Sequence, residues 1–263
     1  MSLVSQMVDK KPEDDGLDLD GLMDEIDGEA ERVKTYIQGF DEAMSGGIPK
    51  GSIVLMAGTA GTMKSSVTFY MLYNNAKLKG LKGLYVSLEQ NRTSLIRHMK
   101  GLGMDVSKIE DKINIWDLGM IRSGLISGET WLNIFKKDLE EYKTKVGLDL
   151  LVIDSLPVLD LITQWKDIRT ELFHLFEWLR DLNVTVFLIS EIPEGERKYG
   201  PHDEDFLADG IIYVRMVETD QNNVTRMIRC VKMRNTAHSS NYFTLLFENK
   251  KFQVTKVIGQ DTS

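Results

Sequence analysis

The chain has 263 residues, of which 42% are hydrophobic and 27% charged, and this composition fits one soluble globular domain with a sizeable core. Its single cysteine, Cys230, excludes an internal disulfide framework. Because no segment approaches the roughly 18 apolar residues of a membrane span and no signal peptide is recognisable, we expect a cytoplasmic protein without a membrane partner.

The formal net charge of −8 resides in residues 1–32, which hold 11 acidic and 3 basic residues. The neutral remainder has no electrostatic footprint for nucleic acid, so we do not expect a nucleic-acid partner. Residues 1–32 offer few large apolar groups against many carboxylates, which predicts a flexible extension.

One pattern stands out in this extension. Leu19, Leu22, Met23 and Ile26 follow the spacing of the apolar face of a helix. Chance patterning in an unstructured segment is one interpretation. The other is a short helix that docks in a groove of a protein partner or of its own domain.

Residues 33–257 are predicted to form one α/β domain, followed by a short tail at residues 258–263. Apolar runs typical of strands buried on both faces alternate with helical patterns, which predicts a mostly parallel sheet flanked by helices. The expected strands are 52–57, 83–88, 113–116, 150–153 and 184–190, and the expected helices are 64–79, one after Asn91, 129–145 and 168–182. Strands expected at 211–214, 225–233, 242–247 and 252–255 are joined by short turns, which predicts antiparallel hairpins at one edge.

The segment between the first of these strands and its helix has the composition of a phosphate-binding loop. It reads Gly58, Thr59, Ala60, Gly61, Thr62, Met63, Lys64, Ser65 and Ser66. Such a loop needs permissive residues that turn backbone N–H groups inward, then a lysine for the phosphates and a hydroxyl for Mg²⁺ at a helix start. All are present in order, which predicts a P-loop (Walker A) that binds ATP or ADP.

One position departs from the P-loop pattern, which places glycine directly before the lysine. Met63 stands there instead. The alternative to a P-loop is a glycine-rich turn with an incidental lysine.

Two acidic residues are expected to complete a phosphoryl-transfer site. Asp154 and Glu89 each follow an apolar strand, and the carboxyl ends of parallel strands share one edge, so both should face Lys64. We expect Asp154 to bind Mg²⁺ together with Ser65, and Glu89 to act as a general base toward water. The alternatives are a carboxylate that caps a strand end and one that favours a helix N-terminus. Ser190, at the end of a later strand, is a candidate sensor of the γ-phosphate.

Four further segments resemble those of a known family. Gly39-Phe40-Asp41 and Gly46-Gly47-Ile48-Pro49 precede the loop, as they do in KaiC-type domains. Ser87-Leu88-Glu89-Gln90 is similar to the family's paired-acid motif, with Gln90 in place of its second glutamate. The segment 231–238 resembles the family's Lys-x-Arg-Gly-Thr-x-His segment. The likeness covers about residues 33–257 and is greatest to single-domain KaiC-like proteins of prokaryotes, especially archaea.

This resemblance implies a RecA-like core that forms hexameric rings, with Mg-ATP bound between subunits and hydrolysed there. It also implies that Lys232, Arg234 and His238 contact the phosphates of the neighbouring subunit's nucleotide, like arginine fingers. The other interpretation of these residues is a solvated edge strand whose cations block aggregation.

Two departures separate the chain from the circadian clock KaiC. It has one such domain rather than two in tandem, and Asp205-Phe206 stands where the clock protein has its phosphorylatable Ser-Thr pair, shortly before Asp209. The first hypothesis is therefore a nucleotide-switched regulatory or signalling ATPase without clock autophosphorylation. A DNA-repair paralogue of the RecA/RadA type is the second, which six acidic residues in the expected central loop 191–206 disfavour. A non-catalytic nucleotide sensor, suggested by Met63 and Gln90, is the third.

Overall fold

A computed structural model of the chain describes residues 31–118, 129–193, 195, 198–200, 202–220 and 222–257. The chain divides into two units, Met1–Glu31 and Arg32–Ser263, and the described helices and strands belong to the second. The apolar pattern predicted between Leu19 and Ile26 and the tail at residues 258–263 lie outside the described residues.

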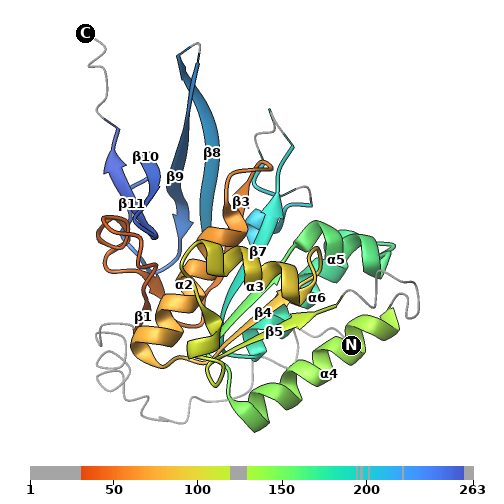
Figure 1. The fold of residues 1–263 in the computed structure, drawn as a ribbon. Helices are drawn as coiled ribbons and strands as arrows, with labels where there is room; N and C mark the ends of the chain where they lie inside the picture. The colour runs from red at the N-terminus through yellow and green to blue at the C-terminus, as the bar shows by residue number, and fades with distance from the viewer. Residues whose placement is uncertain are drawn as a thin grey trace, which may run out of the picture. The chain divides into compact units, whose positions relative to one another are not determined.

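A nine-stranded sheet organises the domain, in the order β11-β10-β9-β8-β3-β7-β6-β4-β5 (Figure 1). Its strands are β3 (Ile53–Gly58), β4 (Gly83–Ser87), β5 (Ile113–Asp117), β6 (Leu150–Asp154), β7 (Thr185–Glu191), β8 (Gly210–Asp220), β9 (Asn223–Met233), β10 (Phe243–Glu248) and β11 (Lys251–Lys256). All neighbours from β8 to β5 pair in parallel, and the pairs from β8 to β11 are antiparallel. The predicted α/β class with antiparallel strands at one edge is confirmed.

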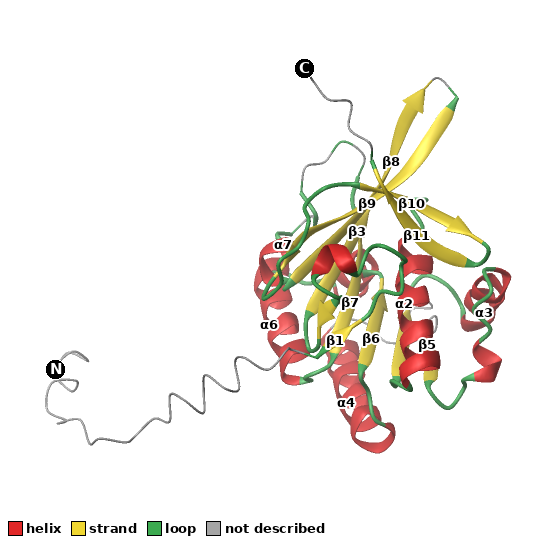
Figure 2. Ribbon diagram, turned by 90° about the vertical axis from the view of Figure 1, so that its left-hand side faces the viewer, coloured by secondary structure: helices red, strands yellow, loops and turns green. Residues whose placement is uncertain are grey.

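Helices cover both faces of the parallel part (Figure 2). They are α2 (Lys64–Lys79), α3 (Arg92–Gly101), α4 (Glu129–Val146), α5 (Leu156–Thr163) and α6 (Ile168–Asp181). Side chains of β3 alternate between two cores: Val54 and Met56 pack with α2 and α3, whereas Ile53 and Leu55 pack with α4, α5 and α6. Burial on both faces explains why these strands appear in the sequence as continuous apolar runs.

At the antiparallel edge, β8 and β9 form a ribbon that extends beyond the other strands (Figures 1 and 2). Each is 11 residues long, whereas the sequence predicted strands at 211–214 and 225–233, so β8 is much longer than predicted. Beyond Val214 the strand β8 no longer pairs with β3 and is hydrogen-bonded to β9 alone. Residues 215–219 are therefore at least partly exposed, and Arg215, Glu218 and Thr219 interrupt the apolar run that marks the start of the strand.

Several short elements were not predicted. Strands β1 (Arg32–Val33) and β2 (Ile48–Pro49) form a separate two-stranded sheet, and α5 and the one-turn helix α7 (Glu204–Leu207) lie in segments for which the sequence predicted no element. Each is too short to show a period in the sequence. None of the described helices is both long and apolar enough to cross a membrane.

Candidate functional site

The loop between β3 and α2 leads directly into α2, and the first turn of this helix has no side-chain cap. Met63 is the N-cap residue, and it makes no side-chain capping hydrogen bond. By contrast, α3 and α6 are capped by the side chains of Asn91 and Asp167. The first N–H groups of α2 therefore have no capping side chain as acceptor. Together with the positive end of the helix dipole, they form a favourable site for an anion.

Lys64 begins α2 and is only 8% exposed. Its ammonium donates a hydrogen bond of 2.7 Å to the carbonyl oxygen of Thr59, so the side chain lies back across the loop. Burial lowers its pKa, while the charges of Glu191, Asp154 and Glu89 act in the opposite direction. The structure therefore brings the predicted cation and both predicted acids into one cluster.

Asp154 ends β6 and is 5% exposed. The Tyr85 hydroxyl of β4 donates a hydrogen bond to its Oδ2 atom, and Ser65 lines the same pocket as Asp154. Burial and the adjacent Asp154 charge raise the pKa of the Tyr85 phenol well above its ordinary value. The phenol thus remains a hydrogen-bond donor at neutral pH. Burial also raises the pKa of Asp154, and the hydrogen bond from Tyr85 opposes that rise.

The oxygen donors of this cluster fit Mg²⁺. This ion commonly binds through one or two carboxylates and takes its other ligands from substrate phosphates and water. Within the described ranges, no three His, Cys, Asp or Glu side chains gather into a metal site of their own. The Ser65 hydroxyl and the Asp154 carboxylate therefore suit an ion that arrives with a nucleotide.

Glu89 lies at the same edge because β4 is the parallel neighbour of β6, with Ser87 opposite Asp154. Its Oε1 atom accepts a hydrogen bond from the Ser155 hydroxyl. Asn91, not Glu89, caps the following helix, since the Asn91 side chain accepts from the N–H of Ser94 at 2.8 Å. Sequence reasoning missed Ser155, although its position directly after the predicted metal carboxylate was a usable signal.

These groups line one pocket of about 340 Å³ at the carboxyl edge of the parallel strands. Its lining residues are Ala60, Gly61, Thr62, Met63, Lys64, Ser65, Ser66, Glu89, Gln90, His98, Asp154, Ser155, Ile189 and Glu191. His98 comes from the last turn of α3 and was not anticipated from the sequence. Glu191 lies opposite Gly58 in the pairing of β3 with β7.

Ser190 lies behind the pocket wall. It is fully buried, and its hydroxyl has no hydrogen-bond partner among the residues that the structure describes. The neighbouring residues Ile189 and Glu191 line the pocket, whereas Ser190 does not. A sensing role for Ser190 stays a prediction.

Lys232 and His238 lie outside the lining of this pocket. The Lys232 ammonium donates to the carbonyl oxygens of Asp205 at 3.0 Å and of Ala208 at 2.6 Å. The His238 Nδ1 atom lies 3.4 Å from the carbonyl oxygen of Ser239. Their predicted contact with phosphates therefore requires a second copy of the chain.

Arg234 is held in a similar way and also lies outside the pocket lining. Its guanidinium donates to Asp209 Oδ1 at 2.7 Å. The other oxygen of Asp209 accepts from the N–H of Ile53 at 3.0 Å, and Arg180 of α6 lies 3.9 Å from the carboxylate. One partly buried carboxylate thus connects the end of β9 with the start of β3.

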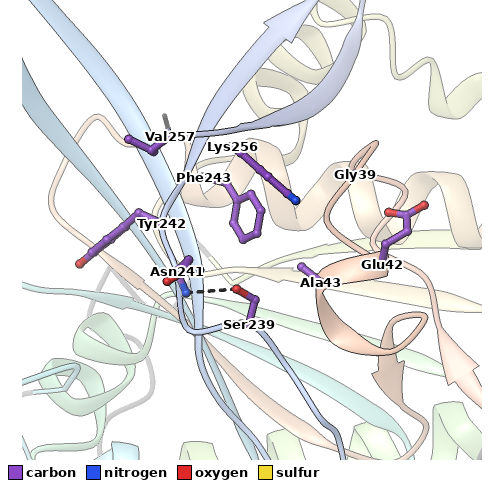
Figure 3. A pocket seen from close by; sticks show the side chains of 9 residues that line it. All are labelled: Gly39, Glu42, Ala43, Ser239, Asn241, Tyr242, Phe243, Lys256 and Val257. Atoms are coloured by element: carbon purple, nitrogen blue, oxygen red, sulfur yellow. Dashed lines mark hydrogen bonds between the residues drawn. The ribbon is translucent and has the colours of Figure 1, made fainter. Parts of the chain in front are cut away.

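A larger hollow of about 650 Å³ lies elsewhere, between the turn at residues 39–43, the loop before β10 and the end of β11 (Figure 3). Glu42, Phe243 and Lys256 are among its lining residues. It shares no lining residue with the phosphate-loop pocket. Because the loop lysine, the uncapped helix and the acids all meet at the smaller pocket, we regard that pocket as the functional site.

Comparisons with known proteins agree with this geometry. The family model "ATPase: KaiC" matches residues 33–257. The circadian clock protein KaiC3 of Synechocystis is 32% identical over 86% of this chain, and the match spans 46% of that protein. A UPF0273 protein of Sulfurisphaera tokodaii is 31% identical over 78% of this chain and 75% of its own length. The crystal structure of a KaiC-like protein from Pyrococcus horikoshii superposes with a TM-score of 0.74 at 30% identity, covering 86% of this chain and 99% of that one.

Proposed function

This chain belongs to the KaiC ATPase family, and on that premise we propose that it binds ATP with Mg²⁺ and hydrolyses it. We place this activity in a ring of identical subunits whose state is switched by nucleotide, in regulation or signalling. The ring is hexameric in this proposal, as the resemblance to KaiC-type domains implies.

One observation carries the proposal. The uncapped start of α2, Lys64, Ser65, Asp154 and Glu89 all lie on the wall of one pocket. These are the parts that phosphoryl transfer needs: donors for the phosphates, ligands for the metal and a carboxylate near the attacking water. Asp154 and Glu89 come from the ends of the neighbouring strands β6 and β4, and Lys64 and Ser65 come from the helix that follows β3.

Each residue has a role that follows from its position. The loop N–H groups and Lys64 bind and orient the phosphates, and Lys64 leaves the Thr59 carbonyl to do so. Ser65 and Asp154 hold Mg²⁺, which when bound neutralises charge on the β- and γ-phosphate oxygens. Glu89, oriented by Ser155, accepts a proton from the attacking water.

The decisive experiment compares ATP binding with steady-state hydrolysis. The wild type, Lys64→Ala and Glu89→Gln are measured side by side in the presence of Mg²⁺. We expect the wild type to bind and turn over ATP, Lys64→Ala to lose binding, and Glu89→Gln to bind ATP while losing about 10²- to 10⁴-fold in turnover. Equal ATP affinity in Lys64→Ala and the wild type would overturn the assignment of the loop.

A second candidate function is a nucleotide sensor without turnover. It is favoured by Gln90, an amide that lines the pocket where the resembled motif has a second glutamate. The same experiment separates the two functions, because a sensor binds ATP at Lys64 but shows no hydrolysis that Glu89→Gln can reduce.

A further inference from the structure

Tyr85 occupies an unusual place for a core aromatic residue. It is fully buried in β4, and its ring lies 5.3 Å from that of Phe69 in the core between the sheet and α2. A phenylalanine would fill the same space. The hydroxyl, however, donates a hydrogen bond to Asp154, which lines the phosphate-loop pocket.

The hydrogen bond to Asp154 offsets the cost of burying this hydroxyl. Removing a hydroxyl from water without a partner is unfavourable, and the partner here is a carboxylate that is itself nearly inaccessible to solvent. A donor on one oxygen of a carboxylate restricts its rotation, so the group presents a defined edge to a ligand. Second-sphere donors commonly orient the ligands of protein metal sites in this way.

We infer that Tyr85 is a positioning residue for the metal half of the site: its hydroxyl fixes Asp154 in the orientation that receives the Mg²⁺ of Mg-ATP. This inference rests on the proposed function. Lys64 and Glu89 are the other charged groups that act on Asp154, and each does so through its charge. Among the described residues of β4, Tyr85 is the one whose side chain donates a hydrogen bond to Asp154.

The test measures how much Mg²⁺ strengthens ATP binding in Tyr85→Phe. ATP affinity is determined by calorimetry with excess EDTA and with increasing Mg²⁺, in the full chain. The control is Tyr70→Phe, which also removes one hydroxyl from the same core, where the Tyr70 ring packs against Phe252. Because Tyr85→Phe keeps the aromatic ring, we expect the ring to keep its packing against Phe69.

We expect Tyr85→Phe to keep the Mg²⁺-free affinity for ATP and to need about 10- to 100-fold more Mg²⁺ for half of the Mg²⁺-dependent gain in affinity. Tyr70→Phe should match the wild type in both measurements. If Tyr85→Phe and the wild type require the same Mg²⁺ concentration, the inference is wrong although the ATPase proposal stands. If the wild type binds no ATP under any condition, both fail.

A second measurement covers the case in which Tyr85→Phe does not fold. Incorporation of 3-fluorotyrosine at position 85 retains the ring and its hydroxyl, and ¹⁹F NMR then reports on the phenol directly. Addition of Mg²⁺ to the ATP-loaded protein should shift this resonance, while the same label at Tyr70 should not shift. An unchanged resonance at position 85 under saturating Mg²⁺ contradicts the inference.

Discussion

At the scale of single residues, Met63 explains how a loop can lack the expected glycine and keep its form. Its backbone is left-handed, with φ 69° and ψ 26°, and this is the region that glycine enters freely. A non-glycine residue there is disfavoured by about 1–2 kcal/mol. The Met63 side chain packs against the core on the α2 side, which offsets part of that cost.

The effect of a substitution at Met63 on ATP binding should therefore depend on how readily the new residue adopts a left-handed backbone. Met63→Gly relieves the left-handed conformation and loses side-chain packing, so we expect the Kd for ATP to change by less than about tenfold, or about 1.4 kcal/mol. Met63→Ile has a similar volume but is β-branched, and such residues strongly avoid positive φ. It should weaken ATP binding by more than about tenfold. Calorimetric titration of both variants checks this, and equal affinities would mean that the loop backbone is not the determinant.

The site residues found from the sequence and those missed differ in one respect. Lys64, Ser65, Asp154 and Glu89 could be predicted because each follows a recognisable strand at a fixed offset. Tyr85 and Ser155 could not, since their significance lies in side-chain contacts across strands that only the folded chain reveals. In the sequence, Tyr85 looks like any aromatic residue of a buried strand.

At the scale of elements, the sequence predicts the parallel part of the fold well and its margins poorly. Strands buried on both faces carry their own signal, as β3 and β6 do. The separate pair β1 and β2 depends instead on the long-range pairing of Arg32 with Pro49, which no local pattern encodes. The outer half of the β8–β9 ribbon is stabilised by cross-strand pairs rather than by burial.

The close contact between β3 and β8 leaves no room for a side chain at Gly58. A Cβ there would lie 2.2 Å from the Val214 carbonyl oxygen and 3.1 Å from the Thr62 hydroxyl. Gly58→Ala should thus lower the free energy of unfolding by about 1–3 kcal/mol, as overpacking does, and should weaken ATP binding. Urea-induced unfolding provides the measurement.

The matched control for this prediction is Gly101→Ala, in α3. A Cβ at Gly101 would meet nothing within 4 Å, and no positive φ is found there. Alanine in a helix is favoured over glycine by roughly 0.5–1 kcal/mol, so this variant should be as stable as the wild type or more so. Similar destabilisation by both alanines would show that the β3–β8 contact is not responsible.

At the scale of the whole molecule, the proposed ring predicts that sites are shared between subunits. Lys64 lines the pocket, whereas Arg234 does not and is expected to act on a neighbour's nucleotide. Lys64→Ala and Arg234→Ala should each abolish turnover. Mixed in equal amounts, they should recover up to about one quarter of wild-type turnover. In a ring of randomly mixed subunits, that share of head-to-tail interfaces has an intact Lys64 on one side and an intact Arg234 on the other.

The control mixes Lys64→Ala with the Lys64→Ala/Arg234→Ala double variant, which offers no complete interface and should remain inactive. Steady-state hydrolysis at several protein concentrations provides the readout. Full turnover and assembly by Arg234→Ala alone would show that Arg234 does not act between subunits.

The way in which the subunit holds Lys232 and Arg234 has a consequence for how fast such rings could form. Carbonyl oxygens of residues 205–208 and the Asp209 carboxylate already fix both side chains in the single chain. A free lysine or arginine loses about 1.5–2 kcal/mol of conformational entropy when it is immobilised. Here that loss occurs during folding, so two colliding subunits meet with ordered cations. For a ring completed by these residues, productive encounters would be limited by orientation and diffusion more than by a search among side-chain rotamers.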